Sequence, residues 1–458
     1  MSGLWSVDDH LADVLDAVRP LEPIELQLLE AQGCVLVEDV TVPAALPPFD
    51  NSSMDGYAVR TADVEGAGAE YPAVLAVVGD VAAGSGELPT VAPGQAARIM
   101  TGAPLPPGAE AVVPVEWTDG GTGGGPAEAM AAHAADPSGS GGEVRVHRPV
   151  RAGQYVRTRG SDVAAGTVAL RAGTVLGPPQ LGLLAAIGRG TVPVRPRPRV
   201  VVLSTGSELV APGEELRRGA IHDSNSYVLT AAARDAGGLP YRVGAVADDA
   251  DALRAAIEDQ LVRADVIVTS GGVSVGAYDV VKEALSSIGT APGDDLVAWG
   301  RGVEFRRLAM QPGKPQGFGL IGADRVPLLA LPGNPVSAYV SFELFVRPVI
   351  RTLMGAPDVH RPRVRARLAT AAPLTSPEGK RQFLRAAYTP PDGTDASDET
   401  GAGAGAAGVP VGTGTVRPVG GAGSHLIAAL AQADALAVIP ETVTEAADGD
   451  ELEVVLLG

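Results

Sequence analysis

The sequence is short of cysteine, of basic charge and of long hydrophobic runs. Cys34 is the single cysteine among 458 residues, which excludes an intramolecular disulfide and fits a reducing compartment. The 54 acidic residues outnumber the 35 basic ones and give a formal charge of −19. Duplex nucleic acid and anionic membranes both require a basic face, so neither is expected as the main partner.

No apolar run is long enough to predict an integral membrane segment. The most apolar stretches, residues 176–188 and 326–340, contain prolines and polar residues. The first residues lack the basic start and apolar core of a signal peptide. We therefore expect a soluble, cytoplasmic protein.

The length predicts roughly three or four domains at about 100–200 residues each. Leu11, Val14, Leu15 and Val18 have helical spacing, and Pro20 would end that helix. Further helices are expected at residues 24–31 and 179–187. Strand-like segments with few helical patterns between them predict a β-rich module; they are residues 73–78, 95–99, 111–116 and 143–150. Residues 118–142 and 391–414 are rich in glycine and predict flexible loops.

From Pro196 onward, strand and helix patterns alternate. The strands are expected at residues 199–203, 241–246, 266–269 and 326–331, and the helices at 226–236, 250–261 and 278–285. This alternation is typical of a doubly wound α/β domain with a mostly parallel sheet. Ligands of such sheets bind at the carboxyl ends of the strands.

One of these strand ends carries the densest signal in the chain. The apolar run at 264–269 leads into Ser270, Gly271 and Gly272, then Ser274 and Asp279, where a helical pattern begins. Such a glycine-rich turn lets backbone N–H groups approach a phosphate, and a carboxylate beside it can hold a cation. Taken alone, the glycines favour a simple tight turn, in which they only supply positive φ.

Other strand ends carry candidates too. Residues 204–208 read Ser-Thr-Gly-Ser-Glu, and residues 332–337 place two prolines around Gly-Asn at a helix start. Asp248 stands beside Asp249, which is also typical of a helix cap. Asp55 and Asp162 lie in turn-like stretches and fit turn stabilisation as well as function. His222 and His425 have no second ligand at metal-binding spacing and are expected to be structural or solvated.

Seven motifs in this order resemble the molybdopterin molybdenumtransferases, the bacterial MoeA proteins, which are similar to the E domain of gephyrin. They read PPFDNSSMDGYA, RTRGSD, STGSEL, DSN, TSGGVSVGAYD, QPGKP and LPGNPVSA. The resemblance covers nearly the whole chain except the two glycine-rich insertions. It implies an elongated homodimer with a C-terminal β-barrel-like domain. The implied domains are a split helical one at residues 1–45 and 148–195, an inserted β-rich module at 46–147, an α/β molybdopterin-binding domain at 196–356 and a β domain at 357–458.

The resemblance also implies an activity and a site. Such enzymes insert molybdate into adenylylated molybdopterin with Mg²⁺, release AMP and form molybdenum cofactor. The implied partners are a second copy of the chain and the enzymes that make molybdopterin. The implied catalytic residues are Asp55, Asp162, Glu208, Asp248, Asp279 and Lys314, of which Glu208, Asp248 and Asp279 would bind the metal. The expected substrate-binding residues are Ser204, Thr205, Gly206, Ser270, Gly271, Gly272, Ser274, Pro332, Gly333, Asn334, Pro335 and Ser337.

The chain departs from this family at one charged position. Many members have Lys-Pro-Gly-Lys where this chain has Gln311-Pro312-Gly313-Lys314. One cation is thereby removed from the implied anion pocket, and Arg306 and Arg307 are candidates to replace it.

Two other functions stay open at this point. The α/β region also resembles the molybdopterin adenylyltransferases, although those are usually a lone domain without the MDGYA and final β modules. A gephyrin-like scaffold is the non-enzymatic alternative, and loss of the acidic residues, which are present here, would favour it.

Overall fold

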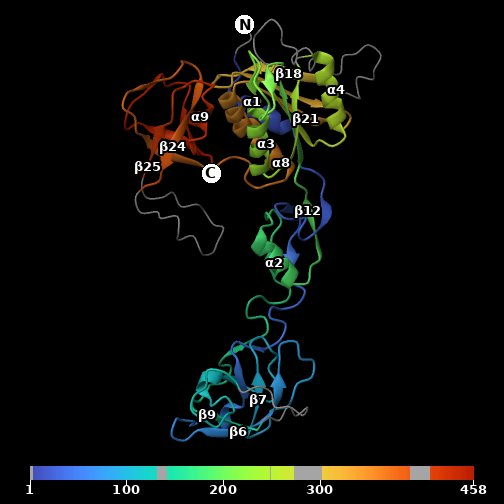
Figure 1. Ribbon diagram of the computed structural model, residues 1–458, viewed down its shortest axis with the longest axis vertical. Helices are drawn as coiled ribbons and strands as arrows, with labels where there is room; N and C mark the ends of the chain where they lie inside the picture. The colour runs from blue at the N-terminus through green and yellow to red at the C-terminus, as the bar shows by residue number, and fades with distance from the viewer. Residues whose placement is uncertain (1–3, 131–141, 248, 273–301, 392–412) are drawn as a thin grey trace. The chain divides into compact units, whose positions relative to one another are not determined.

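The computed structural model describes residues 4–130, 142–247, 249–272, 302–391 and 413–458 (Figure 1). The chain divides into two compact units. The first comprises Met1–Glu25, Gly33–Val37 and Pro193–Gly458, and the second comprises Leu26–Gln32 and Glu38–Val192. Among the described residues, no helix has the length and apolar character needed to cross a membrane.

The second unit is built mainly from short strands. Its five-stranded sheet has the order β8-β5-β7-β6-β9, with β3–β11 and β4–β10 as separate two-stranded pairs. The strands are β3 (Val40–Thr41), β4 (Asn51–Ser52), β5 (Gly56–Val59), β6 (Ala73–Val81), β7 (Gln95–Ile99), β8 (Ala111–Pro114), β9 (Glu143–Val146), β10 (Val156–Arg157) and β11 (Val168–Leu170), and the helix is α2 (Pro178–Ala186). The expected β-rich character of this region is confirmed.

Part of the expected flexible loop at 118–142 is well organised. The buried Asp119 carboxylate accepts hydrogen bonds from the backbone N–H groups of Gly121, Gly123 and Arg145 at 2.9–3.0 Å. One aspartate thus fixes the start of this glycine-rich segment; residues 131–141 lie outside the described part.

The first unit begins with helix α1 (Val7–Ala17). Ser6 caps it, because its Oγ accepts a hydrogen bond from Asp9 N at 2.9 Å. The helix expected at residues 24–31 is wrong: the structure has strand β1 (Ile24–Gln27) followed by turns. Ile24 and Leu26 alternate with polar residues, which is the period of a strand, and Gly33 closes the turns at a φ of 79°. Beyond it, β2 (Val35–Leu36) pairs antiparallel with β12 (Thr191–Arg195).

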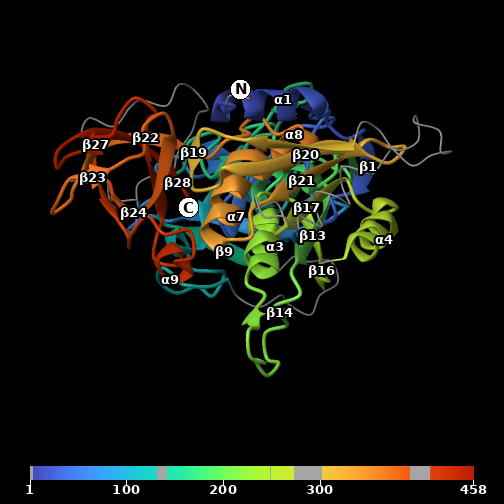
Figure 2. The same ribbon diagram turned by 90° about the horizontal axis from the view of Figure 1, so that it is seen from above.

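A six-stranded sheet with the order β16-β13-β17-β21-β20-β18 forms the centre of this unit (Figure 2). The four neighbouring strands β16, β13, β17 and β21 run parallel. Strand β20 pairs antiparallel with β21 and with β18. Their bounds are β13 (Arg199–Thr205), β16 (Leu239–Val246), β17 (Val266–Ser270), β18 (Gly302–Arg307), β20 (Pro315–Ile321) and β21 (Val326–Leu331). The pair β14 (Leu209–Val210) and β15 (Ile221–His222) lies outside this sheet.

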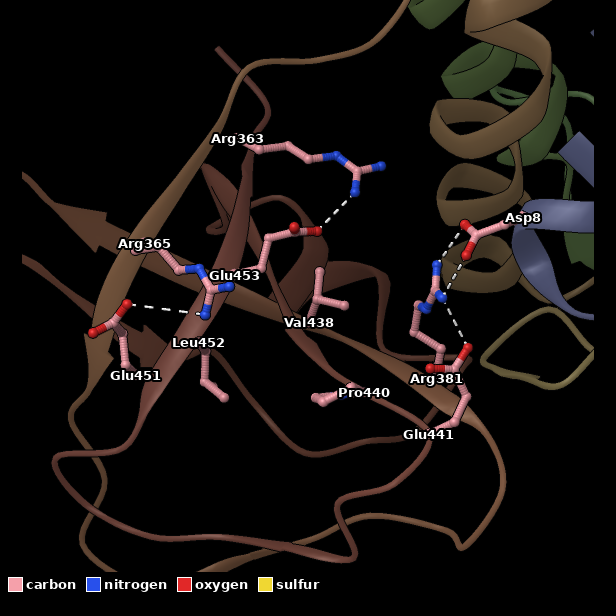
Figure 3. Close-up of a pocket in the computed structure, with 10 residues that line it drawn as sticks. All are labelled: Asp8, Arg363, Arg365, Arg381, Val438, Pro440, Glu441, Glu451, Leu452 and Glu453. Carbon is pink, nitrogen blue, oxygen red and sulfur yellow. Dashed lines mark hydrogen bonds and ion pairs between the residues drawn. The ribbon is translucent and has the colours of Figure 1, made fainter. Parts of the chain in front are cut away.

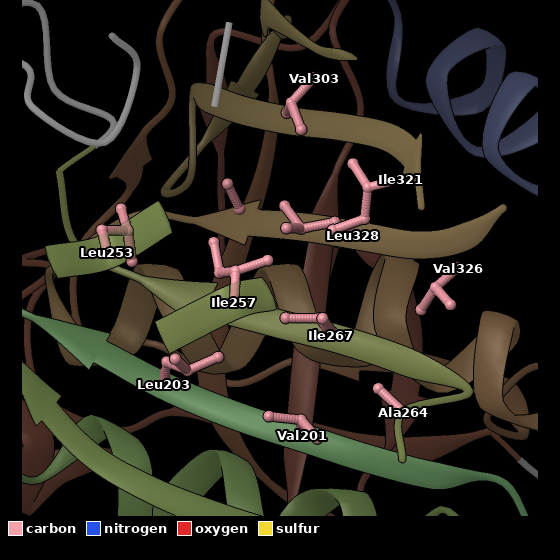
Figure 4. Packing of buried hydrophobic residues seen from close by; sticks show 11 residues of the cluster. Val201, Leu203, Leu253, Ile257, Ala264, Ile267, Val303, Ile321, Val326 and Leu328 are labelled. Carbon is pink, nitrogen blue, oxygen red and sulfur yellow. The ribbon is translucent and has the colours of Figure 1, made fainter. Parts of the chain in front are cut away.

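Helices pack on both faces of the sheet. Helix α4 (Ala250–Leu261) buries Leu253 and Ile257 against Leu203 of β13 and Ile267 of β17 (Figure 4). Because side chains alternate along a strand, Val200 and Val202 point to the opposite face, where α3 (Asn225–Asp235) contacts β13 and β16. The continuous helical run α7 (Pro335–Ser341), π-helix η3 (Phe342–Val346) and α8 (Arg347–Leu353) contacts α3. The predicted doubly wound α/β architecture is confirmed.

The chain ends in a closed β-barrel of five strands. The order is β24-β25-β22-β28-β26, and β24 pairs with β26 to close the ring. The bounds are β22 (Arg363–Leu368), β24 (Arg381–Thr389), β25 (Gly414–Pro418), β26 (Ala435–Ile439) and β28 (Glu451–Leu456), with β23 (Leu374–Thr375), β27 (Glu445–Ala446) and α9 (Ile427–Leu430) beside them. The short strand β19 (Met310–Gln311) leaves the α/β part and pairs parallel with the start of β24.

Candidate functional site

Three strand-end loops meet at the carboxyl edge of the α/β sheet. Ser204 of β13 lies opposite Ser270 of β17, and Ser270 lies opposite Leu331 of β21. The loops that follow these residues therefore leave the sheet side by side. They contain the expected substrate-binding residues Thr205, Gly206, Gly271, Gly272, Pro332, Gly333 and Asn334.

A buried polar cluster ties two of these loops to helix α3. The Ser204 hydroxyl donates to Asp223 Oδ1 at 3.0 Å and lies 3.1 Å from the Ser270 hydroxyl oxygen. Asp223 Oδ1 also accepts from Ser226 N at 3.0 Å. All four side chains are buried, so Ser204 and Ser270 hold the strand ends together rather than present hydroxyls to a ligand. The sequence indicated only a helix cap at residues 223–225, and the contact of Asp223 with Ser204 was not foreseen.

Glycine allows the loop backbones to approach one another closely. At Gly271, where φ is +101°, an added Cβ would lie 2.4 Å from Thr205 O. At Gly333 an added Cβ would lie 3.3 Å from the Gly271 Cα atom. Gly271 N donates to Leu331 O at 3.1 Å, and Gly206 N donates to Val246 O at 3.2 Å. These two N–H groups are thus used within the sheet edge, and the glycines here serve close packing.

Glu208 is the described member of the expected metal ligands. Its side chain is exposed and folds back over Gly206, where an added Cβ would lie 2.7 Å from Glu208 Oε2. Its backbone carbonyl accepts from Ile221 N at 2.9 Å, which fixes the loop against β15. Asp248, Asp279 and Ser274 lie outside the described residues. Within the described part of the chain, no group of three or more His, Cys, Asp or Glu side chains could hold a metal ion.

A cavity of about 460 Å³ lies beside the sheet edge, between the α/β part and the barrel. Its polar lining comes from both parts and includes Gln311, Lys314, Ser337, Lys380, Ser424 and His425. Two lysines line this cavity, and no described Asp or Glu does, so its wall carries positive charge. Lys314 was expected at the site, whereas Lys380, Ser424 and His425 were not expected there. No local motif marks these three as ligand-binding residues, since they come from turns of the barrel.

The loop that carries Lys314 is held in place by a buried side chain. Gln316 is buried, and its Nε2 donates to Gly313 O and to Ser341 Oγ, both at 2.6 Å. On the barrel side, Arg385 Nη1 donates to Gly423 O at 3.0 Å, and Val336 N donates to Ser424 O at 3.1 Å. Both walls of the cavity are therefore anchored by hydrogen bonds.

A second cavity, of about 360 Å³, lies over the barrel and against α1 (Figure 3). Its arginines are paired: Arg363 with Glu453 at 2.7 Å, Arg365 with Glu451 at 3.9 Å, and Arg381 with Glu441 at 2.9 Å. Arg381 also forms two hydrogen bonds with Asp8 at 2.7 and 2.8 Å. This hydrogen bonding lowers the pKa of the Asp8 carboxyl. The three arginines of this cavity face four carboxylates, so it is a weaker anion site than the lysine-lined one.

The second unit brings two of the sequence motifs together. Ser52 and Asn51 of β4 lie opposite Val156 and Arg157 of β10, and Arg159 N donates to Asp50 Oδ1 at 2.7 Å. This joins residues 47–58 to residues 157–162. Both expected site aspartates of this unit, Asp55 and Asp162, are exposed.

Asp55 has a local structural partner as well. Its Oδ1 accepts from Thr101 N at 2.7 Å and from Thr101 Oγ1 at 2.9 Å. The turn-stabilising interpretation of Asp55 therefore has direct contacts in its favour, and it does not compete with a role for the exposed part of the carboxylate.

The sequence matches three family models along its length. They describe the MoeA N-terminal region (domain I and II) at residues 5–188, a probable molybdopterin binding domain at 201–352 and the MoeA C-terminal region (domain IV) at 367–457. The fold is similar to two crystal structures of the molybdopterin biosynthesis MoeA protein from Pyrococcus horikoshii. They share 30% and 27% sequence identity with this chain at TM-scores of 0.70 and 0.66, covering 100% and 99% of it and 100% of their own chains.

Two curated proteins of Mycobacterium tuberculosis (strain H37Rv) align over almost the full length. Molybdopterin molybdenumtransferase 2 is 44% identical over 449 residues, which is 98% of each chain. Molybdopterin molybdenumtransferase 1 is 39% identical over 470 residues, which is 99% of each chain. The chain therefore belongs to the molybdopterin molybdenumtransferase family, and it is a transferase of molybdenum cofactor biosynthesis.

Proposed function

We propose that this protein inserts molybdate into adenylylated molybdopterin, with release of AMP and formation of molybdenum cofactor. The names of its relatives support the substrate class. The observation that carries the proposal is the single segment from Pro332 to Ser337. Its first half packs against Gly271 at the sheet edge, and its Ser337 lines the lysine-lined cavity. A large substrate at the sheet edge would thus lie next to a site for a small anion.

The lysine-lined cavity suits an oxyanion. Molybdate is a tetrahedral dianion that accepts hydrogen bonds, and Lys314 supplies charge while the Ser337 hydroxyl supplies a donor. Ser337 is only 4% exposed, so a bond to it would be shielded from competing water. We assign Lys314 and Ser337 to the molybdate, and the strand-end loops at residues 205–206, 271–274 and 332–335 to the molybdopterin.

We assign the Mg²⁺ site to Glu208, Asp248 and Asp279. Carboxylate oxygens are the donors that Mg²⁺ prefers, and no thiolate or imidazole belongs to the set. In the sheet, β16 and β17, the strands that precede Asp248 and Asp279 in the sequence, flank β13, which precedes Glu208. When bound, the ion would neutralise charge on the phosphoanhydride that breaks. The exposed Glu208 carboxylate, held over Gly206, would orient that region of the substrate.

The direct test is an assay of the purified protein with adenylylated molybdopterin. We expect AMP release that depends on both molybdate and Mg²⁺, with molybdenum cofactor activity appearing in step. Tungstate should be tested in parallel, because it is a tetrahedral dianion of nearly equal size. Tight binding of the substrate without AMP release, at any concentration of either oxyanion, would contradict the transfer reaction and leave a binding role.

A further inference from the structure

A buried carboxylate lies where the helical run beside α3 meets the segment that leads into the barrel. Glu343 belongs to π-helix η3, a rare conformation that occurs often at functional sites, and its side chain is 1% exposed. Glu343 Oε2 accepts from Arg361 Nε at 2.9 Å, and Oε1 accepts from Arg361 Nη2 at 3.3 Å. Burial of a carboxylate is costly unless it is paired and hydrogen-bonded, and Arg361 does both.

The backbone next to Arg361 belongs to the barrel. Arg361 lies two residues before β22, whose first residue, Arg363, pairs with Val455 of β28. Between them, the Pro362 carbonyl accepts a hydrogen bond from Leu456 N at 3.0 Å. The chain is thus tied to the barrel immediately after Arg361, while the Arg361 guanidinium binds a helix of the α/β part. This ion pair therefore joins the two parts.

Asp235 adds a third segment to the same contact. It is the last residue of α3, where a carboxylate is unfavourable because the helix macrodipole is negative at that end. Asp235 Oδ2 accepts from Arg361 Nη2 at 2.5 Å and from Arg347 Nη1 at 2.9 Å. Two carboxylates and two arginines thus form one network, and the contact with the arginines offsets the unfavourable position of Asp235.

Two other contacts of the barrel fix its orientation less strictly. The Arg381 guanidinium binds Asp8 of α1, but the Asp8 side chain is 70% exposed, and exposed ion pairs hold their geometry weakly (Figure 3). The pairing of β19 with β24 involves the two residues of β19. So short a pairing leaves rotation about its own axis. The buried pair of Glu343 and Arg361 removes this freedom.

We propose that Glu343 is a positioning residue, whose ion pair with Arg361 fixes the orientation of the barrel on the α/β part. Glu343 lines neither the lysine-lined cavity nor the one beside α1, so it acts through Arg361. The consequence for substrate rests on the proposed function: turns of the barrel line the lysine-lined cavity, and they move with the barrel. Loss of the ion pair should therefore impair substrate binding more than the chemical step.

The orientation can be measured on the full-length protein without substrate. Spin labels at Glu258→Cys in α4 and Thr415→Cys in β25, both exposed positions, report the distance between the two parts in a Cys34→Ala background. Labelled chains are diluted with an excess of unlabelled protein, so that only distances within one chain are read. We expect one narrow distance distribution when the ion pair is intact and a broader one in Arg361→Gln.

A neighbouring arginine provides the matched control. Arg363 lies two residues from Arg361, and its partner Glu453, at 2.7 Å, belongs to the barrel itself. Arg363→Gln therefore removes the same charge without breaking a contact between the two parts, and it should leave the distance distribution unchanged. Arg361→Lys keeps the charge but loses the planar fork, so it should recover part of the narrow distribution.

A second variant guards against unfolding. Arg361→Gln leaves the Glu343 carboxylate buried without its hydrogen-bonded partner, which favours unfolding. Glu343→Gln combined with Arg361→Gln removes both charges and keeps polar groups of similar size, so the double variant should fold and still show the broader distribution. In the AMP-release assay it should raise the KM for molybdate about five-fold or more and change kcat by less than about two-fold. Circular dichroism and thermal melting establish that each variant is folded.

The outcomes separate this inference from the proposed function. Matching distance distributions in the unaltered ion pair and the folded double variant would overturn the role of Glu343. Equal broadening in Arg363→Gln would also overturn it, because loss of any arginine from this segment would then suffice. A broader distribution with an unchanged KM would refute the consequence for substrate. A wild-type protein that releases no AMP would contradict the proposed function, while the distances would still decide the role of Glu343.

Discussion

Ser204 and Ser270 place their hydroxyl oxygens 3.1 Å apart across two neighbouring parallel strands, at the point where both strands end. The Asp223 carboxylate lies next to this pair and accepts from Ser204. The three residues come from separate segments of the chain, so their contact fixes the relative positions of two strand-end loops and the start of α3. A site built from these loops depends on this contact for its shape.

Removing the Asp223 carboxylate should lower stability. Asp223→Ala leaves the Ser204 hydroxyl and the Ser226 N–H without their buried acceptor, which costs about 1–3 kcal/mol. Asp223→Asn keeps an acceptor oxygen and should cost less. Urea unfolding of the three proteins measures the difference, and an alanine variant as stable as wild type would show that the cluster does not hold the loops.

Gly271→Ala should lower the free energy of unfolding more than Gly213→Ala, a substitution that meets the same backbone strain but no steric clash. Gly213 is the matched control, because its φ is +95° and nothing lies within 4 Å of an added Cβ, whereas at Gly271 the Cβ would lie 2.4 Å from Thr205 O. Both variants should lose about 1–2 kcal/mol to the positive φ. Gly271→Ala should lose further stability and also affinity for molybdopterin. Equal losses in denaturant unfolding would mean that the loops move apart freely.

His10 should make the protein less stable in mild acid. Burial, followed by the nearby charge of Arg306, lowers the pKa of His10 to about 4, and its ring packs edge-to-face on Phe345. The unfolded chain therefore binds a proton below about pH 6.5 and the folded one only near pH 4. The contribution of neutral His10 to the free energy of unfolding is therefore complete above pH 6.5. It is lost as the pH falls to 4, by up to about 3 kcal/mol.

His10→Gln should flatten this pH dependence. Free energies of unfolding at pH 7, 6, 5 and 4.5 give the comparison, and the gap between wild type and variant should narrow as the pH falls. Parallel profiles would show that His10 does not titrate between the folded and unfolded states in this range.

Glu208→Gln should reduce turnover without loss of fold. The side chain is exposed, so the change costs little stability, while the proposed Mg²⁺ site loses one charge. We expect the rate of AMP release to fall about ten-fold or more, which is roughly 1.4 kcal/mol in the barrier. Asp279→Asn should act in the same direction. Glu215→Gln, an exposed neighbour in the same loop region, is the control, and an unchanged rate of Glu208→Gln at saturating Mg²⁺ would exclude the role.

The protein should be a homodimer at its working concentration. The resemblance implies this state and the contribution of residues 47–58 to the partner's site. Light scattering coupled to size exclusion measures the mass against the 46.3 kDa of one chain. A fully active monomer would contradict the expectation.

Local patterns predicted most of the secondary structure. Helix α4 and strand β21 have the bounds that their apolar periodicity indicates, because their core-facing residues repeat regularly. The helix predicted at residues 24–31 was wrong because so short a segment fits both the helical and the strand period. The pairing of strand β1 in the fold decided between them. The strand-end residues Ser204 and Ser270 could be placed at one sheet edge from topology alone. The buried hydrogen bond from Ser204 to Asp223 could not be predicted, since it depends on where α3 begins.

The cavity was beyond prediction for a different reason. Lys380 follows no motif, and only the pairing of Gln311 with Gln382 brings it to the loop of Lys314. A contact between segments so far apart in sequence leaves no local trace. The same reason explains why Arg306 and Arg307, which are closer in sequence to Gln311, were the first candidates.

The β19–β24 pairing also means that the two walls of the cavity are translated at different times. When Lys314 leaves the ribosome, the strand that forms the opposite wall of the cavity has not yet been translated. A nascent chain that stops before Lys380 contains every strand of the α/β sheet but lacks the barrel residues that line the cavity. The cavity is therefore completed only after the C-terminal barrel is made, because turns of the barrel form one of its walls.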